Sequence, residues 1–404
     1  MNLELFIARR LSRERGKRLS RPIIIIAIIS IALAIATMVV SISVLQGFQD
    51  GIKEKISGFS SHIQILSFAS DNVNNNFPIT LSKENQREIA SLKNIKTINP
   101  FILQGGIIKT SSDVKGIVLK AVDNQYDSSF FHNYIVEGRF INTLKKHNEI
   151  IISSFIANKL SLNLGDKLRI YFIRENSYKV RVFDIVGIYQ TGLASYDEKF
   201  AICDIDILQK LNNWSSDEFS GYEIKLKDFS LLEKTANGIY SILDEDKTIQ
   251  RIDQIEPSLF SWLSLLDSNV MVILTILTLV CIVTMVSTLL IIIFEQTSNI
   301  GILKSIGIKN RNIIKIFMFN AAYIVLKGLL YGNVLALALC YLQKNFHIIR
   351  LNESSYFLTS VPIEISFIQI LIVNLATIII CLLALLIPAK SISRIEPIVS
   401  IRFD

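Results

Sequence analysis

Charged residues are absent from long stretches of this sequence. Hydrophobic residues make up 50% of the 404 positions, and Asp, Glu, Lys and Arg together only 19%. Three runs contain no charge, namely Ile23–Leu45, Val270–Phe294 and Phe367–Ile387, and a fourth, Ile316–Leu342, contains only Lys327. Because ~20 apolar residues cross the hydrocarbon core of a bilayer, the sequence predicts four membrane-spanning helices. The composition is too apolar for an ordinary soluble protein.

Cysteine and histidine are scarce, with four residues of each. Only Cys203 lies outside the apolar runs, which excludes a disulfide within the polar part of the chain. The histidines are scattered and lack the spacing of a metal site. The sequence also lacks GxxxxGK[ST], GxSxG and HExxH, the motifs of phosphate loops, serine hydrolases and zinc proteases. We therefore expect no metal, no catalytic residue and no cofactor bound by this chain.

Basic residues in the short segments predict the orientation of the spans. Seven Lys and Arg residues precede the first span, and loop 295–312 contains Lys304, Lys309 and Arg311. The tail 388–404 contains three further basic residues. Because cytoplasmic segments are enriched in Lys and Arg, we expect both termini and this loop to be cytoplasmic. The net charge of +7 is thus explained without a nucleic acid partner.

The N-terminal residues favour a retained anchor over a cleaved signal peptide. The first apolar run is longer than the ~7–15 residues of a signal-peptide core, and no small-x-small cleavage site follows it. Before it, Leu3, Ile7 and Leu11 recur at helical spacing among arginines. This pattern predicts an amphipathic helix on the inner membrane surface.

The one large polar region has the alternating pattern of an α+β domain, and we expect two subdomains in it. The first span is expected to continue as a helix to about Ile56, where Gly58 ends it. Ile95–Gln104 and Gly106–Thr110 are expected as separate strands. A helix over Ser258–Asp267 should lead into the second span, so that two helical stalks join the outer domain to the membrane.

The predicted boundaries follow from these observations. They are a cytoplasmic amphipathic helix (1–22), transmembrane helix 1 (23–45), the outer α+β domain with its stalks (46–269), transmembrane helix 2 (270–294), a cytoplasmic loop (295–312), transmembrane helix 3 (313–342), a short outer loop (343–365), transmembrane helix 4 (366–387) and a cytoplasmic tail (388–404).

The segment Glu295–Lys315, EQTSNIGILKSIGIKNRNIIK, connects the second and third spans. Ile302, Leu303 and Ile306 share one side of a short predicted helix, and Gly307 can end it in a left-handed cap. A short amphipathic helix between spans is suited to binding another protein. An ordinary basic turn is the alternative.

The third span contains the only intramembrane charge. A Lys near mid-span costs ~2.5–3.5 kcal/mol on insertion scales, so Lys327 either faces a partner or cavity, or extends toward the interface. Gly328, Gly332, Ala336 and Ala338 predict close helix contacts in the same span.

Several stretches along the chain share the residues of one family. They are Phe6–Arg10, Val44–Phe48, Ser61–Ile65 (like "PHI.I"), Glu137–Phe140, Asn148–Ile152, Leu164–Lys167, Glu295–Gly307 (like "ERTREIGILKAIG"), Pro388–Lys390, Ser393–Arg394 and Glu396–Ile398 (like "PARRASRIDP"). Together they resemble the FtsX/MacB/LolC-type permeases, the membrane subunits of mechanotransmitting ABC transporters. The Ser61–Ile65 and outer-domain stretches are most similar to the lipoprotein-releasing LolC/LolE/LolF branch.

The resemblance implies an α-helical bacterial inner-membrane protein with four transmembrane helices and a large α+β periplasmic domain inserted between helices 1 and 2. Its function would be to extract lipoproteins from the outer leaflet for delivery to the outer membrane. The implied partners are a cytoplasmic ATPase that binds ATP and magnesium, a second permease subunit (identical or homologous), the lipoprotein cargo, membrane lipids and a periplasmic lipoprotein carrier. Phe172–Lys179 is shorter than the hairpin of carrier-binding members, so this subunit need not bind the carrier itself.

The resemblance also implies site residues. ATPase coupling would involve Glu295, Ile300, Gly301, Ile302, Leu303, Lys304, Ile306 and Gly307. The lipid or cargo would be faced by Met38, Val39, Ile42, Met271 and Leu274. Within the coupling segment, Gln296, Ser298 and Asn299 stand where the family often has Arg, Arg and Glu.

Two alternatives remain within the family. One is control of a cell-wall hydrolase, as in the FtsX branch, and the other is efflux of a peptide or drug, as in the MacB branch. FtsX-type proteins usually have a smaller outer domain, and MacB-type chains usually carry a fused ATPase, whereas residues 1–22 alone precede the first span here. An enzyme in the outer domain is disfavoured by the absent motifs.

Overall fold

The computed structural model describes residues 20–70, 77–110, 113–143, 148–174 and 177–390. The predicted amphipathic helix within 1–22 lies almost entirely outside the described residues, as do the family-like stretches beyond Lys390. The chain divides into two compact units. The helical unit comprises Trp262–Arg350 with the described parts of Met1–Gln49 and Ser360–Asp404, and the sheet unit comprises Asp50–Ser261 and Leu351–Thr359.

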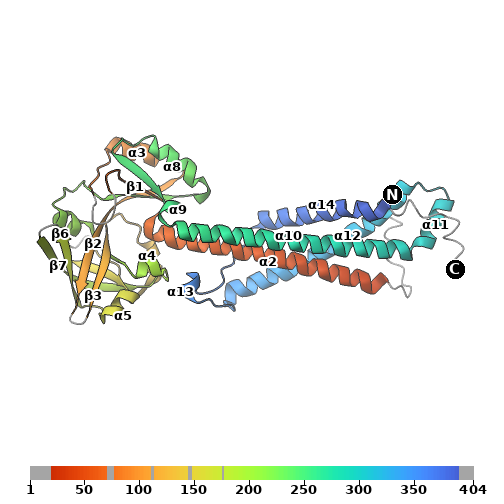
Figure 1. Ribbon diagram of the computed structural model, residues 1–404, viewed down its shortest axis with the longest axis horizontal. Coiled ribbons are helices and arrows are strands. Elements are labelled where there is room, and N and C mark those ends of the chain that lie inside the picture. The colour runs from red at the N-terminus through yellow and green to blue at the C-terminus, as the bar shows by residue number, and fades with distance from the viewer. Residues whose placement is uncertain (1–19, 71–76, 111–112, 144–147, 175–176, 391–404) are drawn as a thin grey trace. The chain divides into compact units, whose positions relative to one another are not determined.

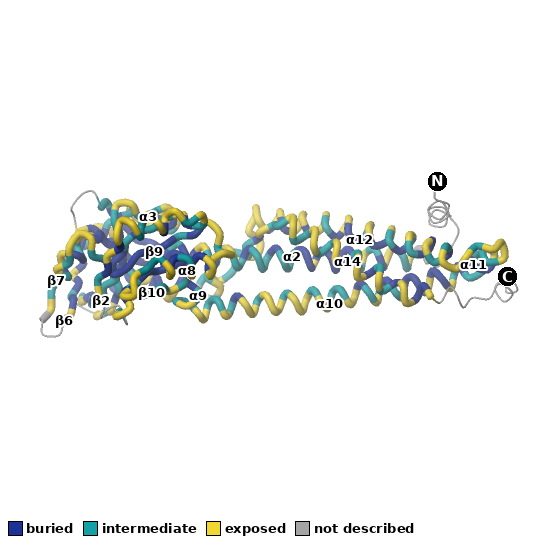
Figure 2. Tube along the Cα trace, turned by 90° about the horizontal axis from the view of Figure 1, so that it is seen from above, coloured by how far each residue is buried: buried dark blue, intermediate teal, exposed yellow. Residues whose placement is uncertain are grey.

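The four predicted apolar helices are present. They are α2 (Ser20–Ser60), α10 (Pro257–Glu295), α12 (Asn310–Phe346) and α14 (Phe367–Ala389), each long and apolar enough to cross a membrane. Within the helical unit they surround one apolar core that includes Ile31, Met285, Ile313 and Leu385. Figure 1 labels these helices, and Figure 2 colours the exposed positions along them yellow. Many of the exposed residues are large and apolar, as expected where lipid replaces water. The short α11 (Thr297–Ser305) connects α10 to α12.

The prediction that Gly58 ends the first helix is wrong. α2 continues to Ser60 and ends at Ser61, whose backbone is left-handed with φ 55°. A Cβ on Gly58 would lie 2.1 Å from the ring of Phe130. Gly58 therefore allows close packing inside the helix, at a propensity cost of ~1 kcal/mol that tertiary contacts override.

The sheet unit is built on one ten-stranded sheet. The strands are β1 (Ile63–Ser67), β2 (Ile95–Lys109), β3 (Val114–Val122), β4 (Ile135–Gly138), β5 (Glu149–Ser153), β6 (Lys167–Arg174), β7 (Ser177–Tyr189), β8 (Phe200–Asp204), β9 (Gly221–Leu226) and β10 (Lys247–Arg251). Their order is β10-β1-β9-β2-β3-β8-β5-β7-β4, with β6 pairing to β2 and β7. The pairs β3–β8 and β5–β7 are parallel and the others antiparallel.

Two lobes share this sheet through β2, which pairs with β9 over its first part and with β3 over its second. The first lobe contains β10, β1, β9 and the start of β2, with α3 (Lys83–Ser91) and α8 (Leu232–Tyr240). The second lobe contains the remaining strands with α4 (Ser129–Tyr134), α5 (Ser154–Leu160), α6 (Ala194–Asp197) and α7 (Ile205–Asn212).

The smaller elements of the sheet unit are η1 (Phe229–Leu231), α9 (Ile252–Ile255) and α13 (Glu353–Tyr356). The expected break near Gly105 does not occur, so the two predicted strands are the single β2. Gly106 instead lets the Ile170 side chain approach, because a Cβ there would lie 2.7 Å from it.

Candidate functional site

The segment between α10 and α12 forms the short helix α11, which ends as its sequence predicts. Gly307 has φ +88°, its N–H donates to the Lys304 carbonyl (3.0 Å), and the Ile308 N–H donates to the Leu303 carbonyl (3.1 Å). This pair of bonds is a Schellman cap, and Leu303 and Ile308 both pack against the helical core. The left-handed glycine cap is confirmed, and it fixes where the chain turns into α12.

The two faces of α11 differ from the predicted amphipathic pattern. Ile300 is 1% exposed, Gly301 is buried and Leu303 packs against the helical core. In contrast, Ile302 is 46% exposed and Ile306 is 72% exposed. The expectation that Ile302, Leu303 and Ile306 share one side is therefore wrong, because Leu303 is held by the core and the cap. The outward surface of α11 and its cap contains Ile302, Ser305 and Ile306.

Polar residues lie at the N-terminal end of α11 and along it. Gln296 is buried, and its Oε1 accepts a hydrogen bond of 2.5 Å from Asn299 Nδ2. Glu295 and Lys304 are half-buried and both have polar contacts. Lys309 and Arg311 are exposed just beyond the cap. The outward surface of α11 thus presents two exposed isoleucines and is followed by exposed cations.

The predicted cargo-facing residues separate into two groups. Met38 and Val39 are each 1% exposed and belong to the core of the helical unit, so within this chain they face neighbouring helices and no open surface. Ile42 is half-buried, and Leu274 packs partly against the same core. Met271 is 70% exposed on α10. Helical periodicity could not distinguish these cases, because every side of these spans is apolar.

Of the four small residues of α12 predicted to make close helix contacts, Gly328, Gly332 and Ala336 are buried, whereas Ala338 is exposed and that part of the prediction is wrong. A Cβ on Gly328 would lie 2.6 Å from Ile31, and one on Gly332 would lie 2.7 Å from the Ala32 carbonyl oxygen. Ala336 is fully buried. Lys327 has no carboxylate partner among the described residues, and its ammonium lies 4.5 Å from the ring centre of Tyr323 on its own helix.

An amide pair between α12 and α14 was missed by the sequence reasoning. Asn333 Nδ2 donates to Asn374 Oδ1 (2.9 Å), and Asn374 Nδ2 donates back to Asn333 Oδ1 (3.1 Å). Each amide also donates to a carbonyl one turn earlier in its own helix. Asn374 is the one Asn of its apolar run, but Ile316–Leu342 contains both Asn320 and Asn333, so the sequence does not reveal which residues pair.

The outer-domain stretches that carry the family resemblance meet around Glu149. Arg139 forms a two-pronged ion pair with this carboxylate (2.5 and 2.9 Å), and the Asn142 N–H donates to it (2.8 Å). Gly138 has φ +79° and lies against Leu164, where a Cβ would come within 2.7 Å. These residues therefore fix loop geometry in the second lobe.

His62, part of the "PHI.I"-like stretch, is a buried structural residue. Its Nδ1 accepts a hydrogen bond from the Leu226 N–H (2.8 Å), and its ring lies 5.5 Å from that of Phe229. Burial, aided by the nearby charge of Lys225, lowers the pKa of His62 to about 4. The imidazole is thus neutral at physiological pH and joins β1 to β9.

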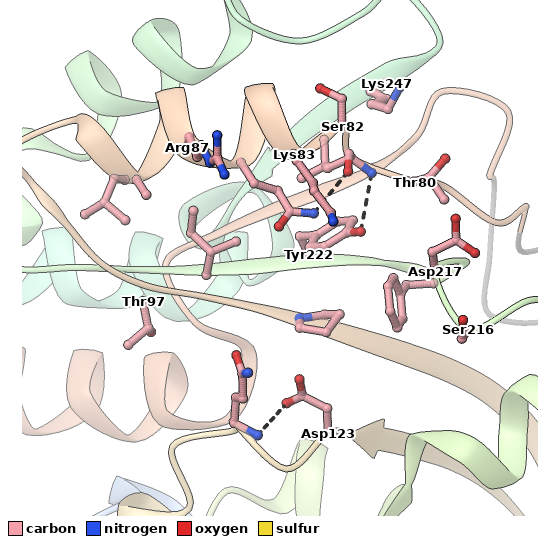
Figure 3. Close-up of a pocket in the computed structure, with 18 of the residues that line it drawn as sticks. Thr80, Ser82, Lys83, Arg87, Thr97, Asp123, Ser216, Asp217, Tyr222 and Lys247 are labelled. Atoms are coloured by element: carbon pink, nitrogen blue, oxygen red, sulfur yellow. Dashed lines mark hydrogen bonds between the residues drawn. The ribbon is translucent and has the colours of Figure 1, made fainter.

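A cavity of about 1170 Å³ lies beside α3 in the first lobe (Figure 3). In that view Lys83 and Arg87 come from the helix above the Tyr222 ring, and Asp123 lies below it. Burial raises the pKa of the Asp123 carboxyl. The lining contains both cations and carboxylates and neither His nor Cys, so it indicates no single class of ligand. The described residues contain no group of three His, Cys, Asp or Glu that could hold a metal.

Comparison with known proteins finds two family matches along the chain. Residues 24–241 match the MacB-like periplasmic core domain family, and residues 271–397 match the FtsX-like permease C-terminal family. Lipoprotein-releasing system transmembrane protein LolC of Buchnera aphidicola subsp. Schizaphis graminum is 28% identical, covering 91% of this chain and 90% of the relative. LolE of Haemophilus influenzae is 24% identical, covering 98% of both chains.

Solved structures similar to this chain include the periplasmic region of MacB from Actinobacillus actinomycetemcomitans. The match covers 52% of this chain and 97% of that structure, with 13% sequence identity and a TM-score of 0.35.

Proposed function

We propose that this chain, which belongs to the ABC transporter permeases with a MacB-like periplasmic core domain and an FtsX-like C-terminal region, releases lipoproteins from the inner membrane. It would extract them from the outer leaflet for delivery to the outer membrane. The supporting observation is similarity over nearly the full length of both chains to proteins named as lipoprotein-releasing LolC and LolE.

The ATPase would be a separate cytoplasmic subunit that binds ATP and magnesium, and α11 would be its docking element. The exposed pair Ile302 and Ile306 supplies an apolar contact, and Lys309 and Arg311 supply charge beside it. Ile300 and Leu303 hold α11 against the helical core. A force applied to the outward surface would therefore reach α10 and α12 directly.

Mechanical transmission is supported by helix length. α2 has 41 residues and α10 has 39, each without interruption. At 1.5 Å per residue, each helix is ~60 Å long, about twice the ~30 Å hydrocarbon core of a bilayer. In this proposal the termini are cytoplasmic, the sheet unit is periplasmic, and both helices move with the ATPase cycle.

The cargo site would form with a second permease subunit, identical or homologous. The acyl chains would contact the exposed apolar side of α10 at Met271, and Ile42 at the outer part of α2. Met38 and Val39 would contribute only if the helices separate, because they are covered within this chain. Direct binding of a periplasmic carrier by this subunit is not part of the proposal.

Depletion of the chain, followed by mass spectrometry of separated inner and outer membranes, tests the function. We expect acylated lipoproteins to accumulate in the inner membrane and re-expression to reverse this. If lipoprotein sorting stays intact, the cargo assignment is wrong, and hydrolase control or efflux becomes the better account.

Docking is tested by Ile306→Asp, which places a charge on the outward surface of α11 without touching the core. We expect the ATPase to be lost from the purified complex and lipoprotein release to stop. Val114→Asp, at an equally exposed apolar position of the sheet unit, is the matched control and should retain the ATPase. Retention of the ATPase by Ile306→Asp would contradict docking at α11.

Cargo contact is tested with photo-crosslinkers at Met271 and at Met38. The Met271 probe should capture acylated lipoprotein and fail to capture its unacylated form. The Met38 probe should capture little of either, because its side chain is buried. Equal capture of both forms at Met271 would exclude an acyl-chain site there.

A further inference from the structure

The outer end of α2 is capped by side chains of two different strands. The last carbonyls of a helix have no partner within the helix itself. Here the Lys120 ammonium of β3 donates to the Phe59 carbonyl, and Gln64 Nε2 of β1 donates to the Ser60 carbonyl (3.2 Å). A cation at this end also complements the helix dipole.

The same two side chains converge on one carboxylate. Lys120 Nζ lies 2.7 and 2.8 Å from the two oxygens of Glu223, and Gln64 Nε2 lies 3.2 Å from one of them. The side chains of Lys120 and Glu223 are each only 2% exposed. The rings of Phe59 and Tyr126 lie 5.5 and 5.6 Å from the ammonium. The ion pair is therefore shielded from water, and both carboxylate oxygens of Glu223 accept hydrogen bonds.

The strands that supply this network belong to different lobes. Lys120 lies on β3 of the second lobe, whereas Glu223 and Gln64 lie on β9 and β1 of the first. β2 separates β9 from β3, so the ion pair reaches across a strand. Three parts of the sheet unit thus meet at one point, namely the first lobe, the second lobe and the end of α2.

Protein stability alone does not explain a buried ion pair such as Lys120–Glu223, because a protein with well-packed apolar residues in its place is often equally stable. An apolar pair could not hold the α2 carbonyls or fix the angle between the lobes. We propose that Lys120, Glu223 and Gln64 are positioning residues that fasten α2 to both lobes, so that a movement of α2 turns the whole sheet. This inference rests on the proposed transmission of motion through α2.

The main test removes both charges and keeps the volume, using Lys120→Met/Glu223→Met in the full chain assembled with its ATPase in lipid nanodiscs. Spin labels on Tyr240→Cys of the first lobe and Val114→Cys of the second report the distance between lobes. Both positions are exposed, and the four native cysteines are buried. In the parent protein we expect one narrow distance distribution with and without nucleotide. In the double variant we expect a distribution about twofold broader.

The second readout is the coupling between ATP hydrolysis by the ATPase and lipoprotein release. Basal ATP hydrolysis should be retained, while ATP hydrolysed per lipoprotein released should rise about tenfold. A double variant with the parent distribution and the parent coupling overturns the inference. If the parent protein releases no lipoprotein, the proposed cargo is wrong, and the distance measurement still decides whether the network holds the lobes.

Two further variants keep the test decisive. Gln64→Leu retains the ion pair and loses the contact with Ser60, so it gives a smaller broadening and decides the matter if the double variant fails to fold. Lys55→Met is the matched control, since Lys55 is likewise a buried lysine but lies on α2 itself. It donates to the Thr191 and Phe357 carbonyls (2.5 and 2.7 Å) and contacts Glu353, none of them in the first lobe. The same broadening in Lys55→Met would show that the effect is general loosening of α2, which contradicts the assigned role.

Discussion

The helical unit and the sheet unit differ in the polar groups that they bury. Among the described residues, the buried polar side chains of the helical unit are uncharged: Ser43, Thr288, Gln296, Gln343 and Thr377. Those of the sheet unit include several charged groups: Lys55, Lys120, Glu149, Asp197, Asp204, Glu223 and Lys247.

The buried threonine hydroxyls of the helical unit are satisfied locally. Thr288 and Thr377 each donate to the carbonyl four residues earlier in their own helix (2.7 and 2.8 Å). Such a group needs no partner from another element, so it tolerates an apolar neighbourhood. Close packing of small residues and the Asn333–Asn374 amide pair contribute to helix association in this unit.

Some buried charges of the sheet unit have a different role, because they connect separate segments, whereas Asp204 and Lys247 are paired locally. Lys120 joins β3 to β9 and to α2, and Asp197 accepts hydrogen bonds from Thr191 and Gly192. Burial raises the pKa of Asp197 while those hydrogen bonds lower it. The comparison indicates that close packing of side chains determines how the helices of the helical unit fit together. In the sheet unit, buried charged side chains and their hydrogen-bond partners fix the geometry.

The largest expected effect comes from breaking one buried pair. Glu223→Leu leaves Lys120 buried without its carboxylate and should destabilise the sheet unit by about 3–5 kcal/mol. Adding Lys120→Met should recover most of this loss. Denaturant unfolding followed by circular dichroism measures both, and a double variant as unstable as the single would contradict this account.

The next largest loss of stability is expected at the close contact between α12 and α2. Gly332→Ala places a methyl group 2.7 Å from the Ala32 carbonyl oxygen and should cost about 1–3 kcal/mol, although alanine is the better helix former. Thermal unfolding of the detergent-solubilised chain measures it. Gly238→Ala in α8 is the control: its nearest neighbour would be 4.0 Å away, so stability should rise by about 0.4–1 kcal/mol.

The neutral state of His62 predicts a pH dependence confined to the sheet unit. Its pKa is about 4 when folded and about 6.5 when unfolded, so between these values the unfolded chain binds the proton more readily. Stability should fall as pH drops below 6.5, by about 2 kcal/mol between pH 7 and pH 5. His62→Asn, whose amide can replace the Nδ1 acceptor, should lose this component. Identical pH profiles of the two proteins would show that His62 does not titrate as described.

The smallest expected effect concerns the amide pair of the helical unit. Asn333→Leu should destabilise by only about 0.6 kcal/mol, because intramembrane hydrogen bonds average about that value. Steric-trap or detergent unfolding can measure the free energy of unfolding of Asn333→Leu, Asn374→Leu and the double variant for comparison. Additive effects of the two substitutions would show that the amides are not coupled.

Local sequence patterns predicted features that depend on few neighbours. The four apolar helices follow from length and hydropathy, the end of α11 follows from Gly307, and most strands follow from alternation. Gly307 was predictable because a glycine after a short helix needs only its own backbone freedom to form the cap.

Features that depend on distant residues were predicted poorly. Gly58 was interpreted as a helix end because Phe130, which packs on it, lies 72 positions away in the chain (130 − 58). Ile302 and Leu303 were placed together because periodicity cannot show which side of α11 the core covers. Met38 and Val39 look the same in sequence as Met271, although only Met271 is exposed.

The sequence by itself determined that this chain has four apolar helices, an α+β region between the first two in chain order, and the residues of an ABC transporter permease. These properties follow from hydrophobic runs and short contiguous stretches. Only the tertiary structure decided which side of each helix is covered, that Asn333 meets Asn374, and that Lys120 and Glu223 meet at the end of α2. The physical reason is that burial and pairing are properties of residues far apart in sequence, and folding alone brings them within bonding distance.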